Sequence, residues 1–323
     1  MSRGFASLCL LCAISQVNWT TSTVAGTFAT LDHPLAAYGT FPTGVSGRNI
    51  VGFYRDASVV DNGFLYNGSM YTPLKDPLGE TRPNAISGRN VVGSYQSGTD
   101  NSVHGFLYDG STYTTLDVPG GRNVQAFGIS GNRIVGGYWN SSSNNDHGFI
   151  YDGSNYTTLD VPSALVTYAL GISGGNIVGE YEDTSGLVHG FLFDGSSFRT
   201  LDAPLANHTE AYGIDGTNIV GFYLDSSNNS HGFLYNGSTW ATLDDPLGTG
   251  TQAYGISGND IVGVYGDSSG IHGFVYTIPE PSGLILLVIG GLSIVGMRVR
   301  RAIAHRSSIP GELSAPQRFY LYQ

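Results

Sequence analysis

The sequence predicts an all-β fold made of six copies of one repeating unit. A Leu-x-x-Pro element recurs every 42 or 43 residues, and each unit is rich in β-branched and aromatic residues. No long stretch shows the apolar period of about 3.6 residues that a soluble helix requires. The Leu/Pro pairs are Leu31/Pro34, Leu74/Pro77, Leu116/Pro119, Leu159/Pro162, Leu201/Pro204 and Leu243/Pro246.

Three further motifs keep the same register as the Leu-x-x-Pro element. An Ile-Ser-Gly-like turn has its glycine at Gly47, Gly88, Gly131, Gly174, Gly216 and Gly258. A Val-Gly-x-Tyr run ends at Tyr54, Tyr95, Tyr138, Tyr181, Tyr223 and Tyr265. A Gly-Phe pair ends at Phe64, Phe106, Phe149, Phe191, Phe233 and Phe274. Their common spacing indicates that the whole central region is one repeat array.

Each unit is predicted to contain four short strands. In the fifth unit we expect them at Ala211–Ile214, Asn218–Tyr223, His231–Tyr235 and Trp240–Leu243. An Asn-Gly or Asp-Gly pair separates the third strand from the fourth, which predicts a two-residue hairpin turn. These pairs are Asn67-Gly68, Asp109-Gly110, Asp152-Gly153, Asp194-Gly195 and Asn236-Gly237.

Six units of four strands predict a six-bladed β-propeller, in which each blade packs between two neighbours. The array begins with a lone fourth strand at Phe28–Leu31 and ends after a third strand at His272–Tyr276. We therefore expect the N-terminal strand to complete the last blade and close the ring, which removes the open edges. An open β-solenoid is the alternative architecture.

The composition limits the partners and the cross-links. Between residues 26 and 277 there are 23 acidic and 8 basic residues, a net charge of −15. Such a charge repels phosphate backbones, so no nucleic-acid partner is expected. The two cysteines, Cys9 and Cys12, lie in the first apolar stretch. A chain cleaved after that stretch has no disulfide and no cysteine-ligated metal.

Residues 1–25 are predicted to be a secretory signal peptide. Arg3 precedes an apolar run from Phe5 to Ile14, and a stretch of small residues ends at Ala25. A short buried strand or a retained N-terminal anchor is the alternative. The predicted organisation is therefore a signal at 1–25, a propeller at 26–277, a sorting segment at 278–301 and a polar tail at 302–323.

The C-terminal segment combines an extended linker, an apolar run and a basic cluster. Pro279, Glu280 and Pro281 precede an apolar or small-residue stretch at 283–297, after which come Arg298, Arg300 and Arg301. The pattern predicts a single transmembrane helix with a cytoplasmic positive flank, although 15 residues is short for a span. A buried hydrophobic helix is the alternative.

This segment resembles the PEP-CTERM sorting signal. The resemblance implies a Gram-negative host, an exosortase-type processing enzyme as partner, and release from an inner-membrane precursor to the cell surface or extracellular matrix. The chain departs from the family pattern because it continues for 22 residues after Arg301.

The repeat resembles the extracellular HAF repeats, with Gly in place of Ala in the His-Ala-Phe triplet. Its histidines are His104, His147, His189, His231 and His272, with Asn62 at the same place in the first unit. A ring of metal-binding imidazoles is one interpretation. We favour a structural hydrogen bond from the third strand, because equivalent positions on different blades are too far apart to share an ion.

The remaining polar residues predict no catalytic site and no cofactor. Carboxylates that follow the repeat leucines are interpreted as turn or capping groups. Loops with several oxygen ligands, at 182–186, 225–229 and 267–270, leave calcium as a possible cofactor, without EF-hand spacing. Residues that break the repeat are Arg55, Lys75, Arg82, Trp139, Glu182, Arg199 and Trp240.

We therefore expect an exported, non-enzymatic propeller that serves as a scaffold or binding protein in the bacterial envelope or exopolysaccharide matrix, with a glycan or an envelope protein as partner. A secreted hydrolase or lyase acting on polysaccharide is the alternative, and it predicts clustered acidic and aromatic symmetry-breaking residues at one mouth of the channel. A calcium-stabilised adhesion module is a third hypothesis.

Overall fold

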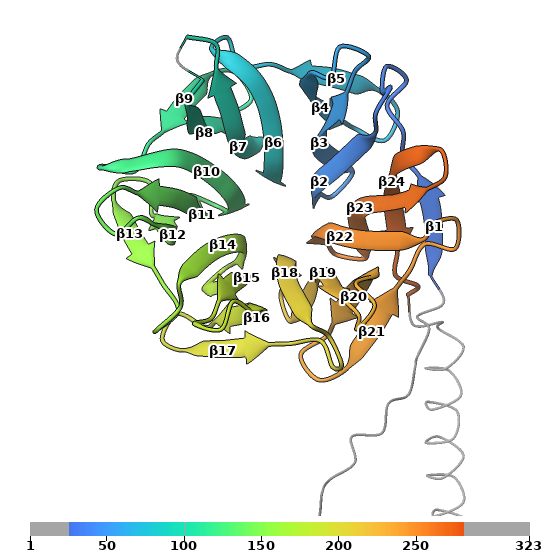
Figure 1. Cartoon of the computed structure of the whole chain (residues 1–323). Coiled ribbons are helices and arrows are strands. Elements are labelled where there is room, and N and C mark those ends of the chain that lie inside the picture. Colours follow the sequence, from blue (N-terminus) through green and yellow to red (C-terminus); the bar gives the residue numbers. More distant parts are fainter. Residues whose placement is uncertain (1–25, 100, 281–323) are drawn as a thin grey trace, which may run out of the picture. The chain divides into compact units, whose positions relative to one another are not determined.

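A computed structural model describes residues 26–99 and 101–280 of the chain. In this part, 24 strands form six antiparallel four-stranded sheets that surround a common axis (Figure 1). The predicted six-bladed propeller is confirmed. It forms one compact unit that ends at Ile278.

Within each blade the strands follow one another outward from the axis. The inner strands are β2 (Thr40–Ser46), β6 (Gly79–Ser87), β10 (Gly121–Ser130), β14 (Val166–Ser173), β18 (His208–Asp215) and β22 (Gly250–Ser257). The second strands are β3 (Asn49–Arg55), β7 (Asn90–Ser97), β11 (Arg133–Asn140), β15 (Asn176–Glu182), β19 (Asn218–Leu224) and β23 (Asp260–Asp267). The third strands are β4 (Asp61–Tyr66), β8 (Val103–Tyr108), β12 (Asn145–Tyr151), β16 (Val188–Phe193), β20 (Ser230–Tyr235) and β24 (Gly270–Thr277). The outer strands are β5 (Tyr71–Leu74), β9 (Tyr113–Leu116), β13 (Tyr156–Leu159), β17 (Phe198–Leu201), β21 (Trp240–Leu243) and β1 (Thr27–Thr30).

The ring closes through the first and last strands. β1 is the outer strand of the sixth blade and pairs antiparallel with β24, from Thr27 opposite Thr277 to Thr30 opposite Phe274. The Leu31 N–H extends this pairing by donating to the Gly273 carbonyl oxygen at 2.8 Å. The complementary ends of the repeat array therefore complete one sheet, and the alternative of an open solenoid is wrong.

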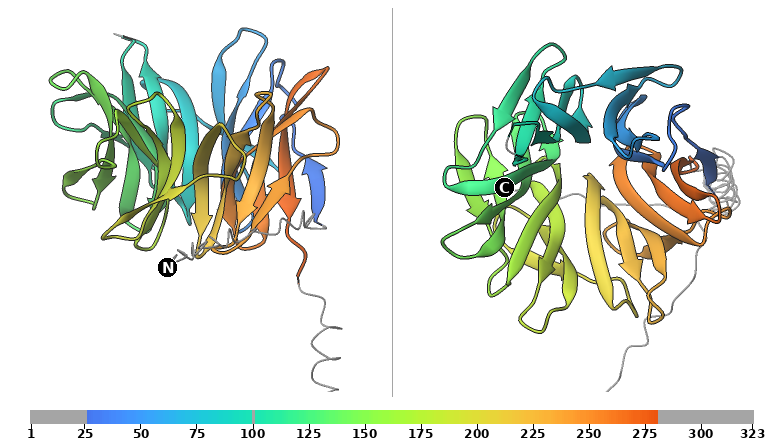
Figure 2. Two further views of the ribbon diagram at one scale, coloured as in Figure 1. Left: turned by 60° about the horizontal axis from the view of Figure 1, so that its bottom comes forward. Right: turned by 45° about the horizontal axis from the view of Figure 1, so that its top comes forward.

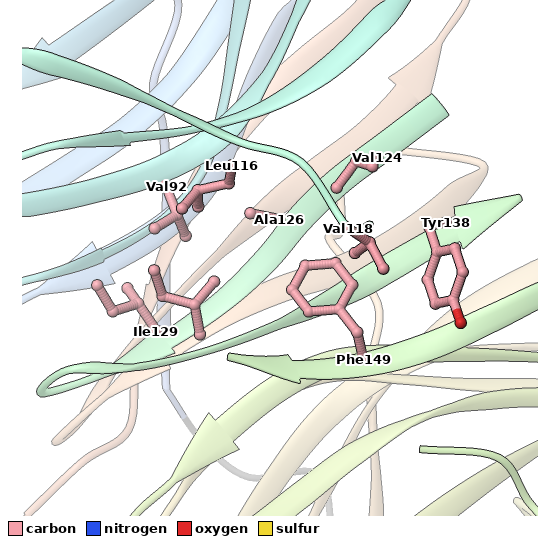
Figure 3. Packing of buried hydrophobic residues seen from close by; sticks show 9 residues of the cluster. Val92, Leu116, Val118, Val124, Ala126, Ile129, Tyr138 and Phe149 are labelled. Atoms are coloured by element: carbon pink, nitrogen blue, oxygen red, sulfur yellow. The ribbon is translucent and has the colours of Figure 1, made fainter. Parts of the chain in front are cut away.

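The core consists of one apolar cluster at each interface between blades. The phenylalanine of every Gly-Phe pair is its centre, with at most 1% of its surface exposed. Figure 3 shows the cluster between the second and third blades, where Val92 and Leu116 of one blade pack with Ile129 and Phe149 of the next. Because each blade buries its two faces only against neighbours, stability depends on the complete ring.

The glycines of two repeat motifs lie where strand backbones approach closely. A Cβ on the glycine of the Val-Gly-x-Tyr run would lie 1.9 to 2.2 Å from an inner-strand carbonyl oxygen. A Cβ on the glycine of the Gly-Phe pair would lie 2.5 to 2.9 Å from the carbonyl oxygen of a repeat leucine. Both distances are below van der Waals contact, so the recurrence of glycine follows from packing.

The Ile-Ser-Gly-like turns link neighbouring blades. The glycine of each turn has a positive φ, between 57° and 63°. In five of the six turns its N–H donates to a side-chain oxygen of the preceding blade, and the bond from Gly47 to Ser257 Oγ spans the closure between the last and first blades. The turn motif therefore contributes a ring of interblade hydrogen bonds.

Two details differ from the sequence predictions. In the hairpins between third and outer strands only the glycine has a positive φ, and the preceding Asn or Asp instead accepts hydrogen bonds from the next backbone N–H groups. The turn is therefore centred one residue later than predicted, with glycine in its first position. The inner strand of the fifth blade is also longer than the predicted Ala211–Ile214, since it begins at His208.

The predicted terminal segments lie mostly outside the described residues. The signal at 1–25, the span at 283–297 and the sorting residues Pro281, Arg298, Arg300 and Arg301 are all in this category. Pro279 and Glu280 are described and follow β24 without regular secondary structure. Within 26–99 and 101–280 no helix is long and apolar enough to cross a membrane.

Close backbone contact around the axis gives a first prediction. A Cβ at Gly171 would lie 2.3 Å from the Tyr212 carbonyl oxygen of the next blade, whereas a Cβ at Gly175 would have no neighbour within 4 Å. We expect Gly171→Ala to lower the free energy of unfolding by about 1 to 3 kcal/mol, as other overpacked sites do. Gly175→Ala is the matched control and should change stability little. Denaturant unfolding measures both, and equal stability of the two variants would contradict the contact.

Candidate functional site

The six inner strands surround a cavity on the propeller axis. Its volume is about 270 Å³, and inner-strand residues of every blade line it. Figure 2 shows these inner strands arranged around the axis. Each inner strand has a β-bulge near its middle, for example between Ala211 and Gly213 in the fifth blade. The bulged residue, Tyr212 in that blade, contributes its side chain to the cavity lining. The inner strands all begin at the same end of the channel, and we call this end the mouth.

The residues around the axis do not repeat, although the blades do. Three positions of each blade show this. The first position lies on the inner strand two residues before the bulge, and the second is the bulged residue itself. The third lies on the second strand, opposite the first position in the antiparallel pairing. The first position holds Phe41, Arg82, Gln125, Tyr168, Glu210 and Gln252. The bulged residues are Thr43, Asn84, Phe127, Leu170, Tyr212 and Tyr254. The paired residues are Phe53, Ser94, Gly137, Glu180, Phe222 and Val264. Packing of identical blades does not require this variety, which makes the channel the candidate site.

Two carboxylates and an imidazole converge at the interface between the fourth and fifth blades, close to the cavity-lining residue Tyr212. Glu180 comes from β15 of the fourth blade, and His208 and Glu210 come from the start of β18 in the fifth. His208 Nε2 lies 2.5 Å from Glu210 Oε1, and one potential ligand atom from each of the three residues lies within 4.8 Å of the others. In the described part of the chain this is the one group of His, Cys, Asp or Glu side chains that converges closely enough to hold a metal.

The electrostatics of this group favour retention of a proton. The pKa of Glu180 is raised to about 8, first by burial and then by the neighbouring charge of Glu210 and a hydrogen bond between the two carboxyl groups. Burial and then the charge of Glu210 also raise the pKa of Tyr212 and of Tyr254. Both phenols are therefore neutral at physiological pH, and the Tyr254 hydroxyl donates to Gln252 Oε1 at 2.5 Å.

A cationic group lies in the first and second blades, which face the fourth and fifth blades across the axis (Figure 1). Arg55 Nε donates to Asp61 Oδ1 at 2.8 Å, and Arg82 Nε donates to Asp61 Oδ2 at 2.7 Å. The Asp61 side chain is 2% exposed, so this buried carboxylate holds both guanidinium groups in place. Arg82 lies over the Phe53 ring at 5.8 Å and Arg55 over the Phe41 ring at 6.0 Å.

The five repeat histidines lie away from the axis, on the third strands. Each donates from Nδ1 to the aspartate that follows the outer strand, at 2.7 to 2.9 Å. Each imidazole also contacts the tyrosine of the Val-Gly-x-Tyr run, at 5.1 to 5.6 Å between ring centroids. Every histidine therefore interacts with its own blade, and the five do not meet in a ring.

The first blade uses other residues at this position. Asn62 Nδ2 donates to Asp56 Oδ2 at 3.0 Å, and Asp56 lies in the loop between the second and third strands. Here an amide therefore makes a hydrogen bond to that loop in place of an imidazole. His33 stacks on Tyr54 at 3.8 Å between ring centroids.

The loops considered for calcium use their carboxylates for internal hydrogen bonds. Asp183 Oδ1 accepts from the backbone N–H groups of Ser185 and Leu187, and Asp225 and Asp267 make the same type of contact. The remaining oxygen of Asp183 faces His189 Nε2 at 3.3 Å. Because these carboxylates organise their own loops, the loops do not converge on a common cation position.

Clefts between blades contain other residues that break the repeat. Trp139 and Arg122 line a cleft of about 650 Å³ between the second and third blades, beside the pair of His104 and Asp117. Lys75 lines a cleft of about 580 Å³ between the first and second blades. Arg199 lies over the Tyr235 ring at 5.7 Å, and Trp240 packs against that same ring at 4.7 Å. Of the residues singled out from the sequence, Arg55 and Arg82 are brought together by Asp61.

Sequence reasoning missed Glu180, His208 and Glu210. It singled out the neighbouring Glu182, which lies on the same strand but outside the cluster. The signal that identifies His208 and Glu210 is the absence of repetition in the first half of the inner strand, between the Leu-x-x-Pro element and the Ile-Ser-Gly-like turn. Glu180 occupies the variable position of the Val-Gly-x-Tyr run in β15.

Solved structures similar to this chain share its architecture. The structure described as a fungal lectin with a six-bladed β-propeller fold and a novel fucose recognition mode, from Aleuria aurantia, is 18% identical, has a TM-score of 0.51, and the match covers 78% of this chain and 97% of that one. A single-residue mutant of the same lectin, solved in complex with α-methyl-L-fucoside, gives the same identity and TM-score, with 96% of its chain covered. At this identity the similarity establishes the six-bladed fold. No protein-family model and no curated protein sequence matches the chain.

The histidine and aspartate pairs give a second prediction. The hydrogen bond to Asp32 raises the pKa of His272 above its ordinary value of 6.5. We expect Asp32→Asn to lower the pKa of His272, as followed by NMR titration of the imidazole. Asp244→Asn is the matched control, because it removes the partner of His231 and should leave His272 unchanged. A His272 titration that is the same in all three proteins would contradict the pairing.

The buried carboxylates give a third prediction, on pH dependence. The folded-state pKa of Glu180, about 8, exceeds its ordinary value of 4.5, so the folded state binds the proton more tightly than the unfolded state. This contribution to stability is fully present below pH 4.5 and is lost as the pH rises towards 8, with a slope of at most about 1.4 kcal/mol per pH unit. With a chelator present to remove metal ions, the free energy of unfolding should therefore fall less between pH 5.5 and 8 in Glu180→Gln than in the wild type.

The matched control for this pH experiment is Glu182→Gln, which removes a charge from the same strand but leaves the cluster intact. Urea unfolding at both pH values measures the difference from wild type. The raised pKa values of His189, His231 and His272 also make stability fall as the pH rises. Because these histidines are present in both proteins, their contributions cancel when the variant is compared with the wild type. Parallel pH profiles of wild type and Glu180→Gln would show that Glu180 does not retain a proton.

Proposed function

We propose that the chain is an exported carbohydrate-binding propeller and that the central channel is its binding site. The observation that carries the proposal is the lining of the axial cavity. Five aromatic residues from four blades contribute to it, namely Phe41, Phe53, Phe127, Tyr212 and Tyr254. A lining of aromatic and apolar groups with a few polar groups is typical of small-ligand sites.

The polar groups near the cavity suit a ligand with many hydroxyl groups. The cavity lining itself includes Asn84 and Thr43. At the channel wall, amide and guanidinium groups from Gln252 and Arg82 can pair with hydroxyl oxygens, and the Glu210 carboxylate can accept from hydroxyl protons. Aromatic faces beside such groups allow a sugar ring to bind by its apolar face and its rim together. A volume of about 270 Å³ is just below the usual range for ligand cavities, about 300 to 1,000 Å³, which favours a single sugar unit or a chain end.

Two further observations support this proposal. The similar propellers from Aleuria aurantia are described as lectins that recognise fucose. The signal-like residues 1–25 and the PEP-CTERM-like segment at 278–301 favour export and sorting to the envelope, where glycan is abundant. Processing by an exosortase-type enzyme, membrane anchoring through residues 283–297 and a location in the exopolysaccharide matrix are parts of the same proposal.

A hydrolase or lyase is the second candidate, because acidic and aromatic residues do cluster in the channel. The spacing of the carboxylates disfavours glycoside hydrolysis. Retaining and inverting glycosidases hold their two carboxyl groups about 5 to 5.5 Å or about 6.5 to 9.5 Å apart, leaving room for the sugar or for a water molecule. Glu180 and Glu210 are hydrogen-bonded to each other, which leaves no room for substrate between them.

The test of this function uses the purified full chain and exopolysaccharide, with co-sedimentation and release of new reducing ends measured together. We expect retention without release. Phe127→Leu removes an aromatic face from the cavity but keeps its apolar character, and should weaken binding by roughly 1 kcal/mol, about fivefold. Phe198→Leu, in an outer strand, is the matched control.

Two outcomes would overturn the proposal. Release of reducing ends would favour the hydrolase or lyase. Loss of binding in Trp139→Leu with full binding in Phe127→Leu would move the site from the channel to the cleft between the second and third blades.

A further inference from the structure

We propose that Glu180, His208 and Glu210 form a binding site for a divalent transition-metal ion of the zinc class in the wall of the channel. The three side chains come from two adjacent blades and supply one imidazole nitrogen and two carboxylate oxygens. This inference does not depend on carbohydrate binding, and the metal alone tests it.

The geometry requires a side-chain adjustment. Three donors bound tetrahedrally to one zinc ion at about 2.0 to 2.2 Å lie about 3.3 to 3.6 Å apart. The ligand atoms here lie within 4.8 Å of one another, so movements of up to about 1 Å, within the reach of glutamate side-chain rotation, bring them into range. His208 and Glu210 are two residues apart on β18 and therefore project from the same face of the strand, while Glu180 reaches them from β15 of the preceding blade.

The charge of the group calls for a cation. Two half-buried carboxyl groups lie in contact, and among residues 26–99 and 101–280 neither is paired with an arginine or a lysine. Arg55 and Arg82, in the first and second blades, are already paired with Asp61. His208 contacts Glu210 at 2.5 Å and compensates one carboxylate only when its imidazole is protonated, whereas a divalent ion would compensate both carboxylates.

The choice of residues is specific to this pair of blades. At the positions equivalent to Glu180 the other blades carry Phe53, Ser94, Gly137, Phe222 and Val264, and at those equivalent to Glu210 they carry Phe41, Arg82, Gln125, Tyr168 and Gln252. No requirement of the repeat places two carboxylates and an imidazole together. The coincidence of three ligand-type residues at one interface therefore needs its own explanation, which a bound ion supplies.

The ligand set indicates the kind of metal. Imidazole suits zinc and related transition metals, whereas calcium and magnesium prefer oxygen ligands alone. Three protein ligands leave coordination positions open, as in zinc sites that bind an exogenous oxygen. The side chains of His208 and Glu210 are 25% and 13% exposed, so the group is not fully closed to solvent. The Phe222 ring lies about 6.0 Å from the rings of His208 and Tyr212 and so provides an apolar contact beside the group.

The experiment titrates the metal-free full chain with Zn²⁺ and measures stoichiometry and affinity by calorimetry. We expect one ion per chain at this site and a loss of affinity of at least tenfold in Glu210→Gln and in His208→Asn. Glu182→Gln is the matched control and should bind as wild type does. Circular dichroism confirms that each variant is folded, and Glu180→Gln provides a third variant should another fail to fold.

Loading the protein with Co²⁺ in place of Zn²⁺ gives a second readout. Its signal arises only if these residues bind the metal, and not if they merely stabilise the fold. A bound Co²⁺ ion with nitrogen and oxygen ligands should give visible absorption bands in the wild type that are absent from His208→Asn. The proposal is overturned if Zn²⁺ does not bind, or if Glu210→Gln and His208→Asn bind it as tightly as the wild type does. It is also overturned if Ca²⁺ binds as tightly as Zn²⁺ and the His208→Asn substitution does not change the affinity for Ca²⁺.

Discussion

The antiparallel pairing of β1 with β24 is the contact on which the rest of the structure depends. It joins strands from opposite ends of the propeller, Thr27–Thr30 and Gly270–Thr277, and so converts a linear array of blades into a closed ring. The apolar cluster at this interface contains Leu31 and Val262 of the last blade with Val45 and Phe64 of the first. Without the closure these side chains would remain exposed and both ends of the array would present open strand edges. The pairing joins residues about 250 positions apart in the sequence, so it carries a larger loop-closure entropy cost than the pairings within the other blades.

Closure determines where residues of different blades can meet. Around the axis the inner-strand backbones approach so closely that five of the six blades have glycine just after the bulge, at Gly44, Gly128, Gly171, Gly213 and Gly255. Side chains beside these glycines face the channel and come within reach of neighbouring blades. Farther out, each repeat histidine interacts with residues of its own blade, namely the aspartate after the outer strand and the tyrosine of the Val-Gly-x-Tyr run. A sixfold repeat therefore produces equivalent pairs at the periphery and a single, unsymmetrical site at the centre.

The same distinction explains what could be predicted from the sequence. Blade number, strand order and closure were predictable because they depend on residues that recur, such as the Leu-x-x-Pro leucines and the buried phenylalanines of the Gly-Phe pairs. The cluster of Glu180, His208 and Glu210 was not, because His208 and Glu210 lie in the half of β18 that precedes the predicted start at Ala211. That half of the strand shares no motif with the other units, so its residues could not be aligned with those of the other repeats. Arg55 and Arg82 could be singled out as exceptions, but their common partner Asp61 is apparent only from the packing.

The channel combines features that act on a ligand in different ways. The arginines of the first and second blades are fixed by a buried carboxylate, whereas the carboxylates of the fourth and fifth blades have no arginine or lysine partner within the described residues and pair only with His208, through Glu210. Aromatic rings line the space between them. A metal ion on the acidic side would turn that wall from a proton-sharing pair into an electrophilic one, able to coordinate a hydroxyl or carboxylate oxygen. If metal and carbohydrate both bind there, thermodynamic linkage requires that each change the affinity for the other by the same factor. The sign of that coupling separates direct coordination of the sugar, which strengthens both affinities, from competition for Glu210, which weakens both.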